Sequence, residues 1–265
     1  MSRALLFAVP GTSSAQAAEA FRNIDRLTQA RFPDIPRSWT YTSGGVRRKL
    51  AAHGTTVEPP AQALSRLRRQ GVKRLAVQSL HLVDGMEYGE LRETIVSFNA
   101  GPDGFERCAL GQPILETPDL FAGIVHELLR EISPPPRGDG DTAALLVAHG
   151  SRQPSARKAY EVAAAYCRGM ETRVMLGTIM EPLGLPSVIS RCRDAGIKRV
   201  FLMPFTIAAG SSVIKDLAGP DPASWRSLLA EEGIECMPVL RGLGEYDAIA
   251  RLWVEEAGKL LEKIQ

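Results

Sequence analysis

The 265-residue chain has few cysteines and no pair of them with CxxC spacing. Its four cysteines, Cys108, Cys167, Cys192 and Cys236, lie far apart in the sequence. A zinc ribbon or a thioredoxin-type redox motif needs two closely spaced cysteines, so the sequence excludes both classes. We expect the four thiols to be unpaired and buried, as is typical of proteins in a reducing compartment.

An excess of charge of one sign and long apolar runs are also lacking. The net charge is +2, and the 32 basic residues are scattered among 30 acidic ones, which argues against binding of nucleic acid or a membrane surface through bulk charge. No run approaches the ~20 apolar residues of a membrane span. The apolar segment ALLFAV near the start is shorter than the core of a signal peptide. We therefore expect a cytoplasmic protein without nucleic-acid or membrane partners.

The sequence does contain an internal repeat. The segment GVKRLAVQSLHLVDGMEY starts at Gly71, and GIKRVFLMPFTIAAGSSV starts at Gly196. A second pair, LLFAVPGTSS from Leu5 and LLVAHGSRQ from Leu145, occurs in the same order. This duplication predicts two halves related by a pseudo-twofold axis. The proline-rich segment SPPPRGDGD separates them, so we place domains at residues 1–136 and 137–265.

Short apolar runs alternate with segments of helical periodicity. The runs are too uniformly apolar for half-exposed strands, which favours parallel strands covered on both faces. The predicted strands are 4–9, 38–42, 74–79, 107–110, 143–148, 173–178, 199–204 and 235–239, and the clearest predicted helices are 118–131 and 156–168. The sequence thus predicts an α/β protein of two doubly wound domains, each with a four-stranded parallel sheet flanked by helices, facing a central cleft. Ligands of such sheets bind beyond the carboxyl ends of the strands.

Three polar side chains at predicted strand ends are candidates for chemistry. His149 directly follows the apolar run LLVA, and the matching position in the other half is Pro10, so the scaffold does not require an imidazole there. A neutral imidazole is a suitable base near neutral pH, although a core histidine satisfied by the backbone is an equally good interpretation. His81 follows another strand, where a structural hydrogen bond is the better interpretation. Glu87 lies two residues beyond Gly85, and the alternative interpretation of this residue is an ordinary surface glutamate.

Small residues in the same loops let backbone amides approach an anionic ligand, and a basic run nearby offers charge for substrate carboxylates. The basic run is Arg47, Arg48 and Lys49. The predicted ligand-binding residues, besides His81, are Gly11, Thr12, Ser13, Ser151, Ser211, Ser212 and Val213.

Six motifs together resemble one known family. In chain order they are LLFAVPGTS, YTSGGVRRKL, VQSLHLVDGMEY, LLVAHGS, AAGSSVIKDLAGPDPASW and RGLGEYDAI. Over almost its whole length the sequence resembles the anaerobic cobaltochelatases of cobalamin biosynthesis, which are internally duplicated class II chelatases. The resemblance implies insertion of a divalent metal, Co²⁺ first and Fe²⁺ or Ni²⁺ as alternatives, into the acidic tetrapyrrole sirohydrochlorin. It implies no nucleotide, and homo-oligomerisation is left open.

The resemblance also implies roles for particular residues. Family members hold the metal with two histidines and a nearby glutamate. His149 matches the first histidine, and Glu87 matches the glutamate of the LHxxxGxEY pattern, so both are expected to contact the metal and to act in catalysis. The position of the second histidine is occupied by Ser212, and Met180 falls where a glutamate is expected, with Glu181 one place along. A serine hydroxyl is a poor replacement for imidazole toward cobalt or nickel.

These substitutions leave two alternatives to metal insertion. One is a degenerate chelatase homologue that binds or carries a tetrapyrrole or haem without inserting metal. The other is a chelatase-like enzyme with an altered metal or macrocycle, including one that removes a metal. The working hypothesis is insertion, with His149 as base and metal contact, Glu87 assisting, and Ser212 as a bystander or weak ligand.

Overall fold

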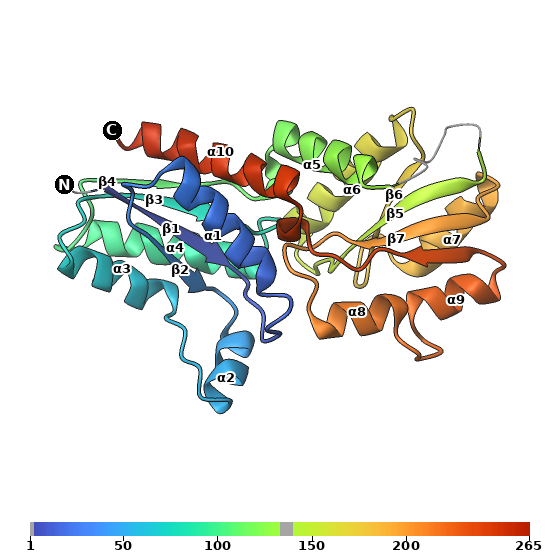
Figure 1. The fold of residues 1–265 in the computed structure, drawn as a ribbon, viewed down its shortest axis with the longest axis horizontal. Helices are drawn as coiled ribbons and strands as arrows, with labels where there is room; N and C mark the ends of the chain where they lie inside the picture. The colour runs from blue at the N-terminus through green and yellow to red at the C-terminus, as the bar shows by residue number, and fades with distance from the viewer. Residues whose placement is uncertain (1–2, 133–139) are drawn as a thin grey trace.

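The structure is a computed structural model that describes residues 3–132 and 140–265. These residues form two four-stranded parallel sheets with the strand orders β2-β1-β3-β4 and β6-β5-β7-β8 (Figure 1). The strands are β1 (Arg3–Val9), β2 (Arg37–Tyr41), β3 (Arg74–Ser79), β4 (Arg107–Leu110), β5 (Thr142–Ala148), β6 (Val174–Thr178), β7 (Arg199–Pro204) and β8 (Glu235–Pro238). The identical order in the two sheets shows that the repeated sequence encodes a repeated topology. The predicted fold class is confirmed, and each predicted strand ends within one residue of the observed one.

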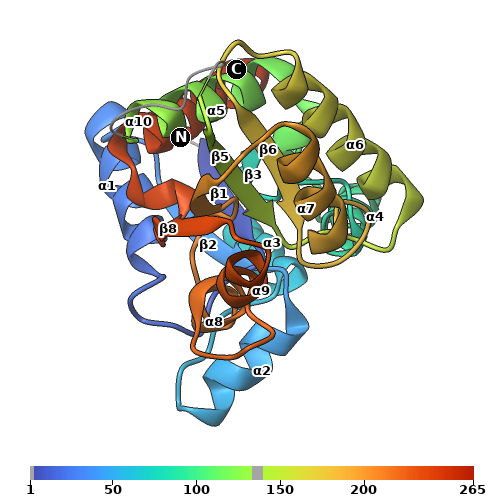
Figure 2. The same cartoon turned by 90° about the vertical axis from the view of Figure 1, so that its right-hand side faces the viewer.

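Helices cover both faces of each sheet (Figures 1 and 2). Helix α6 begins two residues earlier than predicted, because Pro154 occupies its first turn, where proline's fixed φ suits a helix start. The helices are α1 (Glu19–Arg31), α2 (Gly44–Ala52), α3 (Pro60–Arg69), α4 (Met86–Ala100), α5 (Pro118–Arg130), α6 (Pro154–Arg168), α7 (Leu185–Asp194), α8 (Ser211–Ala218), α9 (Trp225–Glu231) and α10 (Asp247–Lys263).

Strand β1 shows why the apolar runs lack polar alternation. Leu5, Phe7 and Val9 belong to the core cluster that also contains α1 and α10 residues. The intervening residues of the strand belong to a second cluster with residues of α3 and α4. Because side chains alternate between the faces of a strand, a sheet buried on both sides needs apolar residues at every position.

The two halves share a core across the repeat boundary. Helix α10 comes from the end of the chain but packs against β3 and α1 of the first half, where Figure 1 shows it lying over the first sheet. In the opposite direction, the Phe121 ring of α5 lies edge-on to Tyr166 and Phe205 of the second half, with centroid distances of 5.5 and 5.8 Å. The predicted boundary between residues 136 and 137 lies outside the described residues and stays a prediction.

The structure shows the state of the cysteines and the character of the helices. All four cysteines are free thiols; Cys167 and Cys192 are buried, and Cys108 and Cys236 are half-buried. Burial raises the pKa of Cys167 to about 12. Within residues 3–132 and 140–265, no helix has the length and apolar character needed to cross a bilayer.

Candidate functional site

Loops from the two halves meet at the carboxyl ends of four strands. The loop after β1 abuts the start of α8, since a Cβ atom added at Gly210 would lie 3.5 Å from Thr12 Oγ1. The loop after β3 contacts the start of α6, because Ser155 Oγ donates to the Asp84 carbonyl oxygen at 3.2 Å. We call the region formed by residues 10–14, 80–87, 149–155 and 205–213 the central site. It contains the carboxyl ends of β1, β3, β5 and β7, where the sequence predicted the functional residues.

His149 is the exposed side chain at the end of β5. Its carbonyl oxygen accepts from the Met180 amide at 2.9 Å, which ties its backbone to the loop after β6. The next residue, Gly150, has a φ of 85° and packs against the Met180 and Glu181 backbone. The backbone is therefore fixed, whereas the imidazole makes no hydrogen bond to the described part of the chain. This environment does not fit a core histidine satisfied by the backbone.

Glu87 is the second residue of α4 and is half-buried. The Thr42 hydroxyl lies 3.4 Å from Glu87 Oε2. Burial raises the pKa of the Glu87 carboxyl, and hydrogen bonds from Ser43 and Thr42 oppose this shift. A raised pKa lets the carboxyl take up a proton more readily than an ordinary surface glutamate.

His81 lies behind Glu87 and is only 4% exposed. Its Nδ1 is 2.9 Å from Ser79 Oγ, and its Nε2 is 2.9 Å from Thr42 Oγ1. Burial lowers the pKa of His81 to about 4, which leaves the ring neutral at physiological pH. Both ring nitrogens are thus engaged by hydroxyls, which favours the structural interpretation of this histidine. The residues Ser79 and Thr42 lie within quoted motifs, but nothing in the sequence shows that they meet the same ring.

The first turn of α8 carries free backbone donors. Ser211, Ser212 and Val213 are its first three residues, and the N-cap is Gly210, which has no side chain to cap them. Within the described residues no acceptor binds their amides, as expected for the first turn of a helix. Such amides, together with the helix dipole, favour anionic groups. Both serines are exposed, so the structure leaves these predicted contacts available.

The other predicted ligand contacts differ in whether their polar groups already form hydrogen bonds within the protein. The Ser151 amide already donates to the Glu181 carbonyl oxygen at 3.0 Å, and its hydroxyl oxygen accepts from the Gln153 amide at 3.2 Å, which leaves the hydroxyl proton for a ligand. Thr12 Oγ1 accepts from the Ser14 amide at 3.1 Å. Ser13 is exposed. Gly11 has a φ of 93°, and a Cβ there would lie 2.4 Å from the Tyr41 ring, so the loop after β1 requires glycine at this place.

The three basic residues of α2 differ in their contacts. Arg47 donates to the carbonyl oxygens of Tyr41 and Thr42, so it holds the end of β2. Arg48 and Lys49 are exposed on α2, which protrudes from the first half (Figures 1 and 2). These two cations remain free to meet a polyanionic ligand.

A closed metal site is absent from the part of the chain that the structure describes. No three histidine, cysteine, aspartate or glutamate side chains there are grouped so that they could hold an ion. Glu181 is exposed and lies 3.7 Å from Arg157, with which it forms an ion pair. Met180 is half-buried. Of the two predicted metal contacts, the imidazole of His149 has no hydrogen-bond partner among the described residues, whereas the carboxylate of Glu87 lies 3.4 Å from the Thr42 hydroxyl.

Solved structures share this architecture. SirB from Bacillus subtilis with Fe³⁺ aligns with a TM-score of 0.66 at 14% identity, over 98% of this chain and 96% of that one. A sirohydrochlorin chelatase SirB from Bacillus subtilis subspecies spizizenii, in complex with cobalt, aligns with a TM-score of 0.64 at 13% identity, over 99% and 97% of the two chains. The fold is therefore that of the two-sheet chelatases.

The family follows from the sequence comparisons. The family model described as cobalt chelatase (CbiK) matches residues 3–262. The sirohydrochlorin cobaltochelatase CbiKC of Nitratidesulfovibrio vulgaris strain Hildenborough is 32% identical, over 96% of this chain and 88% of the relative. The sirohydrochlorin cobaltochelatase of Salmonella typhimurium is 31% identical, over 96% and 94%. This chain belongs to the cobalt chelatase (CbiK) family, which confirms the resemblance seen in its motifs.

Proposed function

We propose that this protein is a sirohydrochlorin cobaltochelatase that inserts Co²⁺ into its substrate without a nucleotide. The observation that carries the proposal is the exposed, unengaged imidazole of His149 at the meeting point of the two halves of a CbiK-family fold. The relatives that match nearly the whole chain are named for this reaction. The partners are then a tetrapyrrole and a metal ion, both as substrates, in the cytoplasm.

The reaction requires acceptors for two protons, because the incoming divalent ion replaces two pyrrole N–H hydrogens of the macrocycle. The imidazole of His149, which no described residue engages, is the first of these acceptors. The carboxyl of Glu87, whose pKa is raised by burial, takes up a proton more readily than an ordinary glutamate. The α8 amides at Ser211–Val213, with Arg48 and Lys49, bind the carboxylates on the rim of the ring.

The sparse donor set suits a metal that is a substrate. An ion held by His149 and Glu87 alone would keep most of its coordination positions open. A closed cage of four protein ligands would compete with the nitrogens of the macrocycle. Loose binding allows the ion to pass from water to the tetrapyrrole.

A second candidate function is binding or transport of a tetrapyrrole without insertion. It is favoured by Ser212 and Met180, which stand where the family resemblance implies a histidine and a glutamate. In this case the free amides of α8 would hold the ring and His149 would serve only as a contact.

The test is an anaerobic absorbance titration of sirohydrochlorin with the purified protein and Co²⁺, Fe²⁺ or Ni²⁺ added separately. We expect catalysed insertion by the wild type, fastest with Co²⁺, and a loss of at least ~100-fold in His149→Ala, since a positioned base typically contributes that much. His126→Ala is the matched control, because His126 is exposed on α5 outside the central site. Its rate should equal that of the wild type.

Unaltered turnover by His149→Ala would refute the proposed role of this residue. If the wild type binds the ring without inserting any of the three metals, and Ser212→His brings insertion, the carrier function holds and the enzyme proposal is wrong.

A further inference from the structure

Three arginines form a row at the amino-terminal edge of the first sheet. Arg3, Arg74 and Arg107 open β1, β3 and β4, and they are direct register partners across these hydrogen-bonded strands. Register partners in a parallel sheet project to the same face, and neighbouring strands lie ~4.8 Å apart. Like charges directly opposite one another on a sheet are destabilising. The row therefore needs compensation by negative charge.

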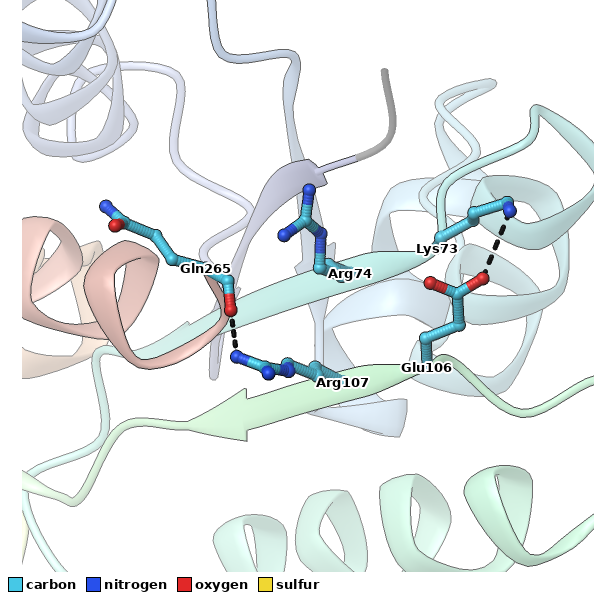
Figure 3. A pocket seen from close by; sticks show the side chains of 5 residues that line it. All are labelled: Lys73, Arg74, Glu106, Arg107 and Gln265. Atoms are coloured by element: carbon cyan, nitrogen blue, oxygen red, sulfur yellow. Dashed lines mark hydrogen bonds and ion pairs between the residues drawn. The ribbon is translucent and has the colours of Figure 1, made fainter.

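No acidic side chain among the described residues forms an ion pair with the three arginines, although Glu255 and Glu262 line the same cavity as Arg3. Arg107 donates to the main-chain oxygen of Gln265. The acidic neighbour Glu106 is engaged elsewhere, in an ion pair with Lys73 at 3.1 Å. Arg3 and Arg74 are half-buried and form no hydrogen bond or ion pair within residues 3–132 and 140–265. Figure 3 shows Arg74 lying between the two engaged pairs without a partner.

The second half provides an internal comparison at the equivalent position. Arg199 opens β7 as Arg74 opens β3, and each follows a lysine in the repeated sequence. The register partners of Arg199 are Thr142 and Glu235 rather than arginines. Arg199 also forms an ion pair with Asp141 at 2.8 Å. The repeated scaffold thus neutralises this arginine in one copy and places it between two arginines in the other.

An open cavity lies beside the arginine row. Its volume is about 440 Å³, and it is lined by Lys73, Arg74, Glu106, Arg107 and Gln265 (Figure 3). A second cavity of about 270 Å³, which also includes Gln265, is lined by basic residues such as Arg3 and Arg31 and by the acidic residues Glu255 and Glu262. Both cavities lie at the amino ends of the strands, whereas the central site lies at their carboxyl ends. The length of a six-residue strand, ~20 Å, separates the two regions.

We propose that this edge of the first sheet is a binding site for a small multivalent oxyanion of the phosphate type. The planar guanidinium groups of Arg74 and Arg107 match the paired oxygens of a phosphate group and bind it through two parallel hydrogen bonds each. Arg3, the register partner of Arg74 on β1, adds a third positive charge to the row. The anion supplies the negative charge that Asp141 and Glu235 provide in the second half. This site is independent of the proposed chelatase reaction.

The test is isothermal titration calorimetry of the full chain with inorganic phosphate, pyrophosphate and citrate at constant ionic strength in a chloride background. We expect pyrophosphate to bind most tightly, because it presents the most charge in phosphate form. Arg74→Gln should weaken its affinity at least tenfold. The matched control Arg199→Gln alters the equivalent arginine of the second half and should leave the affinity unchanged.

Thermal unfolding gives a second readout of the same site. Pyrophosphate should raise the Tm of the wild type and of Arg199→Gln, but not that of Arg74→Gln. Without the anion, Arg74→Gln should be at least as stable as the wild type, since it relieves repulsion within the row. Absence of binding by the wild type beyond the chloride background, equal pyrophosphate affinity in Arg74→Gln, or tighter binding of citrate than of pyrophosphate would each overturn the proposal.

Discussion

At the scale of single residues, Gly150 determines how His149 leaves β5. Its φ of 85° lies in the left-handed region, and a Cβ there would come within 2.7 Å of the Glu181 carbonyl oxygen. Gly196 also has a positive φ, 65°, but a Cβ there would meet nothing within 4 Å. Comparing substitutions at the two glycines therefore separates the energetic cost of a positive φ from that of a steric clash.

We expect Gly150→Ala to lower the free energy of unfolding by at least about 3 kcal/mol, because backbone strain and a steric clash add. Gly196→Ala should cost only about 1 kcal/mol, since it meets the strain alone. Urea denaturation of both variants measures the difference. Equal costs would show that the Glu181 loop moves aside.

The buried His81 predicts a dependence of stability on pH. Its pKa is lowered by burial to about 4, below the ~6.5 of an unfolded chain, so protonation favours unfolding. The corresponding stability, about 3 kcal/mol, is fully present above pH ~6.5 and is lost as the pH falls toward 4. His81→Gln should flatten this part of the pH profile of urea unfolding. His126→Gln, at an exposed position, should not change it; an unchanged profile in His81→Gln would contradict the lowered pKa.

The sequence predicted that His149 lies at a strand end, because it directly follows an apolar run, whereas Glu87 lies in the first turn of α4 rather than at the end of β3. It did not predict the hydroxyls that surround His81, since Thr42 comes from a neighbouring strand and no local pattern records that contact. Nor did the sequence predict that the Ser151 amide is hydrogen-bonded, because its acceptor lies on the loop after β6. The predicted roles of these residues in binding and catalysis stay predictions.

At the scale of elements, the strands were predicted within one residue because strands covered on both faces form continuous apolar runs. The position of α10 could not be predicted in this way. Its amphipathic pattern indicates that one face is buried, but not which surface covers it. Only the structure shows that it packs on β3 and α1 of the other half.

Trp253 is the fully buried anchor of α10, and its indole N–H has no acceptor among the described residues. We expect Trp253→Ala to lower the free energy of unfolding by about 3–5 kcal/mol through the cavity it leaves. Trp253→Phe should cost much less, about 1.5 kcal/mol or below, because it keeps most of the ring and removes an unpaired buried donor. Chemical denaturation distinguishes these outcomes, and a similar loss in both variants would mean that the N–H has a partner.

At the scale of the whole molecule, one core cluster contains residues of both sheets, α1, α5, α6 and α10. The halves are alike in sequence and topology, yet neither half buries its apolar surface alone. Duplication of the sequence therefore does not imply two independently folding units in this protein.

We expect a single cooperative thermal transition for the intact chain, with the calorimetric enthalpy equal to the van't Hoff enthalpy. Trp253→Ala, in the second half of the sequence but packed on the first sheet, should lower the Tm of that one transition without splitting it. Differential scanning calorimetry measures both quantities. Two resolved transitions in the wild type would show that the shared core does not couple the halves.

The crossing of α10 onto the first sheet has a consequence for synthesis on the ribosome. The first sheet is complete in the nascent chain once β4 has emerged, but the part of its apolar face that α10 covers stays exposed until α10 has been translated. At ~5–20 residues per second this exposure lasts on the order of ten seconds. During that time the growing polypeptide presents an apolar surface of the kind that molecular chaperones bind, so production of this protein in a cell depends on how that surface is shielded.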